Sequence, residues 1–222
     1  MKAKSIPGVK RIIDLTHPLY HQCPSWPGLP QPEIKRIKTL PYDGATIHLL
    51  TMHTHTATHM DAPAHFIDGA KTLEEIPLDV LIGEAALVNI QGKKPKDFIT
   101  PQDLAPNMHI REGDFVVLNT GWHKKRGINR EYQLWWPSLN REAAEWLARR
   151  KIRGLGTDGA SIDQLGGQDY PAHEVILGNG IFVVEELANL DQISQKRFII
   201  CVLPLNIPGV DGSPARVIAL EF

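Results

Sequence analysis

The stretch His55-Thr-Ala-Thr-His59-Met-Asp61-Ala-Pro-Ala-His65 places three histidines and one aspartate within eleven residues. Neutral imidazole and carboxylate are ligands that divalent zinc and manganese accept. A lone histidine is usually a satisfied polar residue rather than a ligand. Four such side chains spaced this closely are difficult to explain as core packing. The stretch therefore predicts a metal site, and a catalytic one.

The spacing leaves two local geometries open. His55 and His59 are four residues apart, so one helical turn would place both on one face. A strand followed by a tight bend would also bring them together, and the β-branched threonines around them favour this version. His53 competes for the first ligand position, because residues two apart on a strand share a face. We prefer His55, since His-x3-His-x-Asp forms one compact clip, and expect His53 and His48 to support the ligands or lie on the surface.

Length and charge limit the kinds of protein that this chain can be. Its 222 residues are enough for one large domain or two small ones. No repeat, low-complexity tract or linker divides them, so we expect one domain over 1–222. The 24 basic and 25 acidic residues leave a formal net charge of -1. This balance gives no electrostatic footprint for nucleic acid, and no apolar run is long enough to span a bilayer.

The ends of the chain and its cysteines indicate a cytoplasmic protein. The amino terminus, Met1-Lys-Ala-Lys-Ser-Ile-Pro-Gly8, is positively charged but lacks the apolar core of a signal peptide. The two cysteines, Cys23 and Cys201, do not form a disulfide framework. Cys201 lies in an apolar run and is expected to be a small buried hydrophobe.

The apolar pattern predicts an α/β domain built around mixed strands, with few long helices. Short runs rich in β-branched residues are typical of buried strands. The predicted strands are 85–90, 115–119, 181–184 and 198–203, and residues 49–52 lead a further strand into the histidine cluster. Asn140 is expected to cap a helix over 141–150, and Pro171–Gly178 to form a short helix. Thr72–Glu75 is a possible capping box, and Pro101 a first helical residue.

Further ligands must come from distant segments. His173 lies on the predicted short helix, and Glu185 follows a buried apolar strand, where a carboxylate is costly unless it is paired or coordinates a cation. Alternatively, Glu185 and Glu186 mark only the end of the strand, with Glu186 pointing to solvent. Asp158 and Asp163 lie in a glycine-flanked loop that either orients ligands or is only a turn, and we favour the turn.

The motif resembles the His-x-Gly-Thr-His-x-Asp-x-Pro-x-His signature of the cyclase-like metal-dependent hydrolases, which include bacterial kynurenine formamidases and isatin hydrolases. The resemblance extends over nearly the whole chain, with one departure: Ala57 stands where the family usually has glycine. Alanine fits if the backbone there has negative φ and strains the loop otherwise. Further blocks that resemble the family in order are Asp14–Leu19, Trp26–Gly28, Asn119–Trp122, Thr157–Asp163, Val184–Asp191 and Asp211–Ile218.

The resemblance implies roles for particular residues. It implies a site for two metals, with His55, His59 and Asp61 as ligands of one. Asp61 then bridges to the second metal, which His173 and the bridging Glu185 also hold. His65 becomes the acid/base residue, and Trp26, before the early Pro-Gly, lines the substrate pocket. The family also implies a swivelling β/β/α fold and a homodimer.

The expected reaction is hydrolysis of a small amide. Zinc lowers the pKa of bound water from 15.7 to about 7 and so supplies hydroxide near neutral pH, and an imidazole beside the metals can protonate the leaving amine. An N-formyl aryl amine such as N-formylkynurenine is the first expectation. A cyclic amide or lactone is the alternative, and a metal-binding protein without turnover is a third. Two zinc ions are the first expectation for the metals, and manganese also suits the ligands. The loop Gln133–Pro137 is left open as a lid, a dimer contact or a packed loop.

Overall fold

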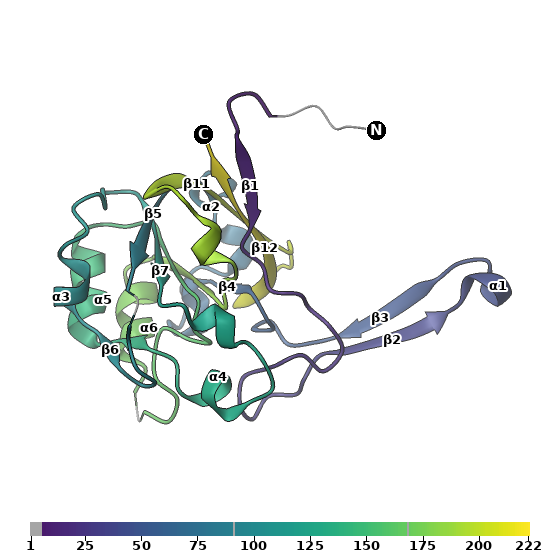
Figure 1. The fold of residues 1–222 in the computed structure, drawn as a ribbon. Coiled ribbons are helices and arrows are strands. Elements are labelled where there is room, and N and C mark those ends of the chain that lie inside the picture. The colour runs from purple at the N-terminus through teal and green to yellow at the C-terminus, as the bar shows by residue number, and fades with distance from the viewer. Residues whose placement is uncertain (1–5, 91, 168) are drawn as a thin grey trace.

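A mixed sheet of eight strands forms the centre of the computed structural model, which describes residues 6–90, 92–167 and 169–222 (Figure 1). The strand order is β1-β12-β11-β5-β7-β9-β10-β4, and β4 also pairs with β12. Seven strands therefore close into a barrel, and β1 lies outside it along β12. The strands are β1 (Arg11–Asp14), β4 (His59–Asp61), β5 (Ile82–Asn89), β7 (Phe115–Asn119), β9 (Gly154–Thr157), β10 (Phe182–Glu185), β11 (Arg197–Pro204) and β12 (Gly212–Glu221).

The sheet is parallel in its middle and antiparallel at its ends. The pairs β5–β7, β7–β9 and β9–β10 are parallel, whereas β4, β11 and β12 pair antiparallel with their neighbours. On β7, Phe115 and Val117 join the core inside the barrel, while Val116 and Leu118 join a second core under the helices. Burial on both faces explains why this strand is a continuous apolar run. The predicted mixed α/β architecture is confirmed; the swivelling β/β/α assignment stays a prediction.

Two helices cover the outer face of the parallel strands, α5 (Arg141–Arg149) and α6 (Pro171–Gly178). Asn140 caps α5, as predicted, by accepting a hydrogen bond from the Ala143 amide at 3.0 Å. The other helical elements are single turns or little more: α1 (Leu40–Asp43), α2 (Leu78–Leu81), α3 (Pro101–Leu104), α4 (Arg130–Leu134), η1 (Pro63–His65), η2 (Leu73–Glu75), η3 (Trp122–Lys125) and η4 (Leu190–Gln192). The Thr72–Glu75 capping box is present at η2, and Pro101 begins α3.

The four predicted buried strands correspond to β5, β7, β10 and β11 within a few residues. The ten-residue β12 was not predicted, because it begins with Gly212 and Pro214, which disfavour strands. A separate pair of short strands, β6 (Phe98–Ile99) and β8 (Ser138–Leu139), is parallel.

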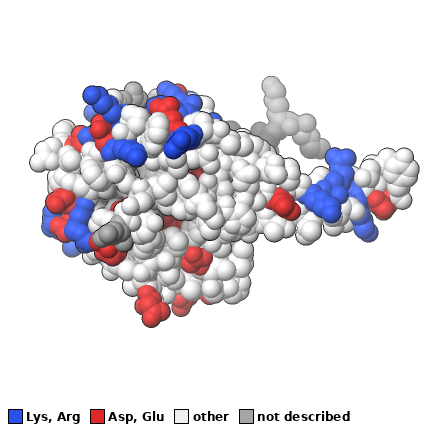
Figure 2. Space-filling model, turned by 90° about the horizontal axis from the view of Figure 1, so that it is seen from below, with Lys and Arg blue, Asp and Glu red and all other residues white. Residues whose placement is uncertain are grey.

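An arm formed by β2 (Glu33–Lys38), α1 and β3 (Ile47–Thr51) extends away from the barrel (Figure 1). The predicted strand at 49–52 is thus present and precedes the histidine cluster, but it belongs to this two-stranded arm and not to the barrel. Basic side chains gather on the arm (Figure 2), where β2 contains Lys35, Arg36 and Lys38. Residues 1–5 of the amino-terminal stretch lie outside the described residues. In the described part of the chain, no helix has the length and apolar character needed to cross a membrane.

Candidate metal centre

Two adjacent strands place three of the predicted ligands on one face of the barrel wall. β4 and β10 are antiparallel, with His59 opposite Glu185 and Asp61 opposite Val183. Met60, between the two β4 ligands, points into the core inside the barrel. Because side chains alternate along a strand, His59, Asp61 and Glu185 face outward together, toward α6. All three are buried.

His55 reaches the same site from the bend that precedes β4. Its Nδ1 lies 2.7 Å from Oδ1 of Asp61, and its ring is perpendicular to that of His59 at a centroid distance of 5.1 Å. The bend passes through Ala57, whose φ of 54° is left-handed. The strand-and-bend geometry is therefore present and the helical turn is not. Alanine at this family glycine position is in a strained conformation.

The fifth predicted ligand, His173, comes from the first turn of α6. Its Nε2 lies 3.3 Å from Oε1 of Glu185 and 3.8 Å from Oδ2 of Asp61. Asp163 accepts hydrogen bonds from Nδ1 of His173 at 2.8 Å and from the backbone amides of Ala172 and His173 at 2.9 Å each. The favoured interpretation of Asp163 as only a turn residue is wrong, because its carboxylate caps the start of α6 and holds the His173 ring.

In each candidate ligand histidine, one ring nitrogen forms a hydrogen bond with an oxygen on the side away from the candidate metal site. An acceptor on one nitrogen fixes the tautomer and leaves the other nitrogen free to coordinate, which is the usual arrangement of metal-bound histidine. The acceptors are the Ala57 carbonyl oxygen for His59, Asp163 for His173 and Asp211 for His55. The free nitrogens are Nε2 of His59, Nε2 of His173 and Nδ1 of His55, and all of them face Asp61 or Glu185.

The donor set fits two divalent cations that share Asp61. Three groups of side chains have ligand atoms within 4.8 Å of one another, and two of these groups share Asp61: His55, His59 and Asp61, and Asp61, His173 and Glu185. The third group is His55, His65 and Asp211. Nε2 of His59 and Oδ2 of Asp61 are buried without a hydrogen-bond partner among the described residues. An unpaired buried polar atom is costly, so each needs a partner that the protein itself does not supply. One cation in each group would satisfy both atoms.

The carboxylates of Asp61 and Glu185 also favour positive charge between the candidate ligands. Burial disfavours the imidazolium form, but Asp61 and Glu185 outweigh it and raise the pKa of His59. Hydrogen bonds to Asp163, Asp61 and Glu185 likewise raise the pKa of His173 against the effect of burial. Burial raises and the neighbouring histidines lower the pKa of Asp61, with a net lowering. Asp61 therefore stays ionised, and metal cations can replace the protons that the histidines otherwise hold.

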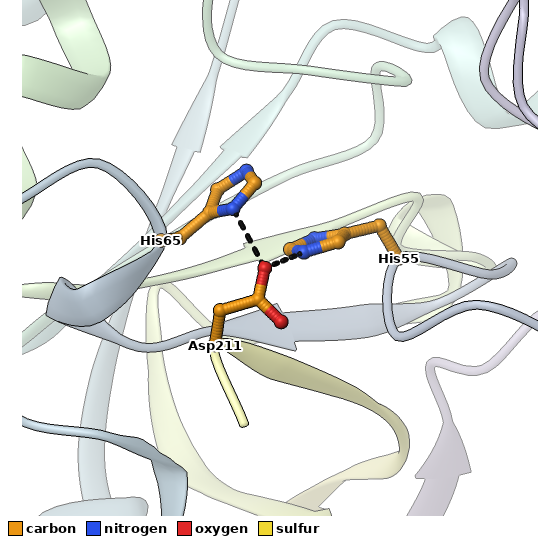
Figure 3. Close-up of side chains that lie close together, drawn as sticks. All are labelled: His55, His65 and Asp211. Carbon is orange, nitrogen blue, oxygen red and sulfur yellow. Dashed lines mark hydrogen bonds and ion pairs between the residues drawn. The ribbon is translucent and has the colours of Figure 1, made fainter. Parts of the chain in front are cut away.

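His65 lies beside this cluster at the end of η1. Its ring stacks on that of His55 at 3.9 Å between centroids, and its Nδ1 is 3.0 Å from Oδ2 of Asp211 (Figure 3). No residue in the described part of the chain forms a hydrogen bond with its Nε2. Burial lowers the pKa of His65, so its neutral form is favoured near pH 7. A neutral imidazole with a free nitrogen can accept a proton.

A cavity of about 240 Å³ opens onto the candidate ligands. Its walls combine candidate ligands with aromatic side chains, among them Trp26, Phe66 and Tyr170. Trp26 occupies the predicted position on the wall, and its ring contacts that of Trp136 at 5.5 Å between centroids. Trp136 is buried, which favours the packed-loop interpretation of Gln133–Pro137.

Other polar residues singled out in the sequence lie outside the ligand groups. His53 contacts the Ser25 hydroxyl through Nε2 at 2.7 Å, and His48 is exposed on the arm. Asp158 is fully buried but accepts from Thr120 and His123, where it anchors the η3 turn.

Two features of the site could not be read from local patterns. Glu186 does not point to solvent: it is buried and accepts from Nε of Arg126 at 3.1 Å, because the η3 segment, distant in sequence, covers it. Asp211, which contacts both His55 and His65, was not identified as a site residue. Its only signal in the sequence is its place in the block Asp211–Ile218.

Known proteins similar to this chain include kynurenine formamidases and isatin hydrolases. Residues 13–164 match the family described as putative cyclase. Kynurenine formamidase of Bacillus cereus (strain ZK / E33L) is 28% identical over 208 residues, covering 93% of this chain and 95% of the relative. Kynurenine formamidase of Erythrobacter litoralis (strain HTCC2594) is 29% identical over 215 residues, covering 96% and 95%.

Solved structures agree with this relationship. Isatin hydrolase A from Labrenzia aggregata, bound to benzyl benzoate, superimposes with a TM-score of 0.86 at 32% identity, covering 95% of this chain and 93% of that one. A potential metal-dependent hydrolase with cyclase activity has a TM-score of 0.81 at 31% identity, covering 96% and 98%. The chain belongs to the cyclase family of metal-dependent hydrolases.

Proposed function

We propose that this protein hydrolyses a small amide, with an N-formyl aryl amine such as N-formylkynurenine as the first candidate substrate. The observation that carries the proposal is the pair of ligand groups sharing Asp61, which opens into a cavity with His65 on its wall. His55, His59, Asp61, His173 and Glu185 would hold two divalent ions, zinc or manganese. When bound, such ions supply a water of lowered pKa and polarise a carbonyl.

The protein's own residues support the remaining requirements of amide hydrolysis. Water oxygen adds to the carbonyl carbon, the C–N bond breaks, and the leaving amine gains a proton. Nε2 of His65 is free to take the proton from the nucleophile and return it to the amine. The aromatic side chains of Trp26, Phe66 and Tyr170 can stack against an aryl ring and exclude water from it.

A cyclic amide or lactone is the second candidate. The similarity to isatin hydrolase A, at 32% identity and a TM-score of 0.86, supports it as strongly as the formamidase relatives support the first. N-formylkynurenine and isatin both carry an amide nitrogen on an aryl ring, so the aromatic side chains of the cavity can stack against either.

The test is a hydrolysis screen of the full chain loaded with zinc or with manganese. N-formylkynurenine, isatin and simple lactones are compared at equal enzyme and metal concentrations. Turnover of N-formylkynurenine above the others supports the first candidate, and preference for isatin supports the second. Full metal occupancy with no turnover of any of them would support a metal-binding protein instead.

We also propose that the protein is a homodimer in which the arm takes part. The arm exposes several large apolar side chains, of which Tyr42 is 90% and Leu40 63% exposed. A two-stranded ribbon is marginally stable alone, so a covering surface would stabilise it. The molar mass in solution, measured by light scattering, tests this proposal.

A further inference from the structure

One carboxylate contacts two histidines of the centre at once. Oδ2 of Asp211 lies 2.7 Å from Nε2 of His55 and 3.0 Å from Nδ1 of His65 (Figure 3). Its other oxygen, Oδ1, accepts a hydrogen bond from the Thr54 hydroxyl at 3.0 Å. Among the described residues, the hydrogen bonds of this carboxylate are therefore all with side chains of the motif and of Thr54 beside it.

The backbone fixes Asp211 in this place. Its carbonyl oxygen accepts a hydrogen bond from the Ala62 amide at 2.8 Å, directly after the ligand Asp61. The next residue, Gly212, begins β12 and pairs with Asp61 across the β4–β12 ladder. Asp211 thus immediately precedes the strand that pairs with β4, and this pairing places its carboxylate beside the candidate ligands although it is distant from them in sequence.

The contacts determine which nitrogen of each ring carries a proton. An ionised carboxylate only accepts hydrogen bonds, so both imidazoles present an N–H to Oδ2. For neutral His65 this places the proton on Nδ1 and leaves Nε2 as the basic nitrogen. For His55 it places one proton on Nε2, so the proton between Nδ1 and Asp61 is the one that a cation at this nitrogen would replace.

We propose that Asp211 is a positioning residue, which sets the tautomer and ring orientation of His65 and links this histidine to the ligand His55. The inference rests on the proposed hydrolase function. Asp211 lies behind two residues that line the cavity and acts through them, so it does not itself touch the substrate. Carboxylate partners of this kind hold active imidazoles in the required tautomer in unrelated hydrolases.

The kinetic test uses Asp211→Asn in the full chain at saturating zinc. Because the amide keeps the shape but removes one acceptor oxygen and the charge, we expect kcat to fall about 10- to 100-fold, with KM changed far less. Asp211→Glu retains the charge and should recover part of the loss. The matched control is Asp14→Asn: Asp14 is a carboxylate of similar exposure, 43% against 38%, that pairs with Arg216 and belongs to none of the ligand groups. It should keep the wild-type kcat.

A double-mutant cycle shows whether Asp211 acts through His65. In the His65→Ala background, Asp211→Asn should reduce kcat by less than about twofold further, because the group that it positions is already absent. Losses that multiply would overturn the proposal. So would an Asp211→Asn variant that has the wild-type kcat at saturating zinc and loses activity only at limiting zinc, since Asp211 would then support only His55.

The third measurement does not depend on activity. Nitrogen-15 NMR of the imidazoles in the zinc-loaded protein, with the His65 signals identified by their loss in His65→Ala, reports the tautomer directly. We expect Nδ1–H in the wild type and a shift toward Nε2–H in Asp211→Asn. A wild-type Nε2–H tautomer would overturn the inference even in an active hydrolase. Nδ1–H in a protein that hydrolyses none of the substrates would instead refute the proposed function and leave the positioning of His65 intact.

Discussion

Replacement of Ala57 by glycine should stabilise the protein, although it removes a methyl group. Ala57 is buried in the bend between two candidate ligands and has a φ of 54°. An L-residue in this left-handed conformation costs about 1–2 kcal/mol, whereas glycine adopts it freely. Glycine also increases the entropy of the unfolded chain, which offsets about 0.4–1 kcal/mol of that relief. These two terms leave a gain of about 0–1.6 kcal/mol, and the loss of the buried methyl group subtracts about 0.8 kcal/mol from the upper end. The net expectation is therefore a gain of up to about 1 kcal/mol, or about 2–4 °C in Tm for a chain of this size.

Ala148→Gly is the matched control for this substitution. Ala148 lies in helix α5, where the same change should destabilise the protein by about 1 kcal/mol. Urea unfolding of the two variants and the wild type, at one metal concentration, should therefore give changes of opposite sign. Equal destabilisation by both would show that the bend at Ala57 stores no strain. Because the Ala57 carbonyl oxygen accepts from Nδ1 of His59 at 2.7 Å, metal content is measured alongside.

Three further predictions concern metal, substrate and pH. Glu185→Gln should lose at least one of two metal equivalents in elemental analysis. The control Glu174→Gln, on the exposed side of α6, should keep both equivalents. Full metal retention in Glu185→Gln would show that Glu185 is not a ligand. Trp26→Ala should raise KM for aryl substrates far more than it lowers Tm, and a large loss of Tm with unchanged KM would make Trp26 a packing residue. Burial and the nearby Arg126 lower the pKa of His17 to about 3. Between pH 6.5 and about 3 the unfolded chain therefore binds a proton that the folded chain does not, so wild-type stability falls as pH falls, by up to about 1.4 kcal/mol per pH unit from this group. His17→Gln should flatten that slope in urea unfolding at pH 4.5–6.5 and leave it unchanged above pH 7; parallel curves for both proteins would contradict this assignment.

The candidate site was predictable to the extent that its residues are close in sequence. His55, His59 and Asp61 form a local motif, so their spacing alone indicates a shared site. Placing His173 and Glu185 beside them required the family resemblance, since the register between β4 and β10 is a long-range property that no local pattern contains. Asp211 was missed because its place beside the motif is also set by long-range strand pairing. Locally, an Asp-Gly-Ser sequence has only the composition of a turn.

The fold shows a similar limit. The run at β7 was predicted because burial on both faces leaves a continuous apolar sequence. The closure of the barrel was not predicted, because β4 is only three residues long and two of these residues are polar. Glu186 shows how a charged residue at a strand end can be buried by a partner, Arg126, that its neighbours in the sequence do not reveal.

The double pairing of β4 connects folding to metal loading. This short strand closes the barrel, because it pairs with β10 on one side and with β12 on the other. Both partners are far from β4 in the sequence. Closing the barrel through such a strand costs loop entropy that three residues of backbone hydrogen bonding repay poorly. Ions held by His59, Asp61 and Glu185 would tie β4 to β10. Metal binding and ring closure should therefore form one cooperative event, with amide exchange at Met60 slowing on loading while exchange in the middle of β7 stays the same.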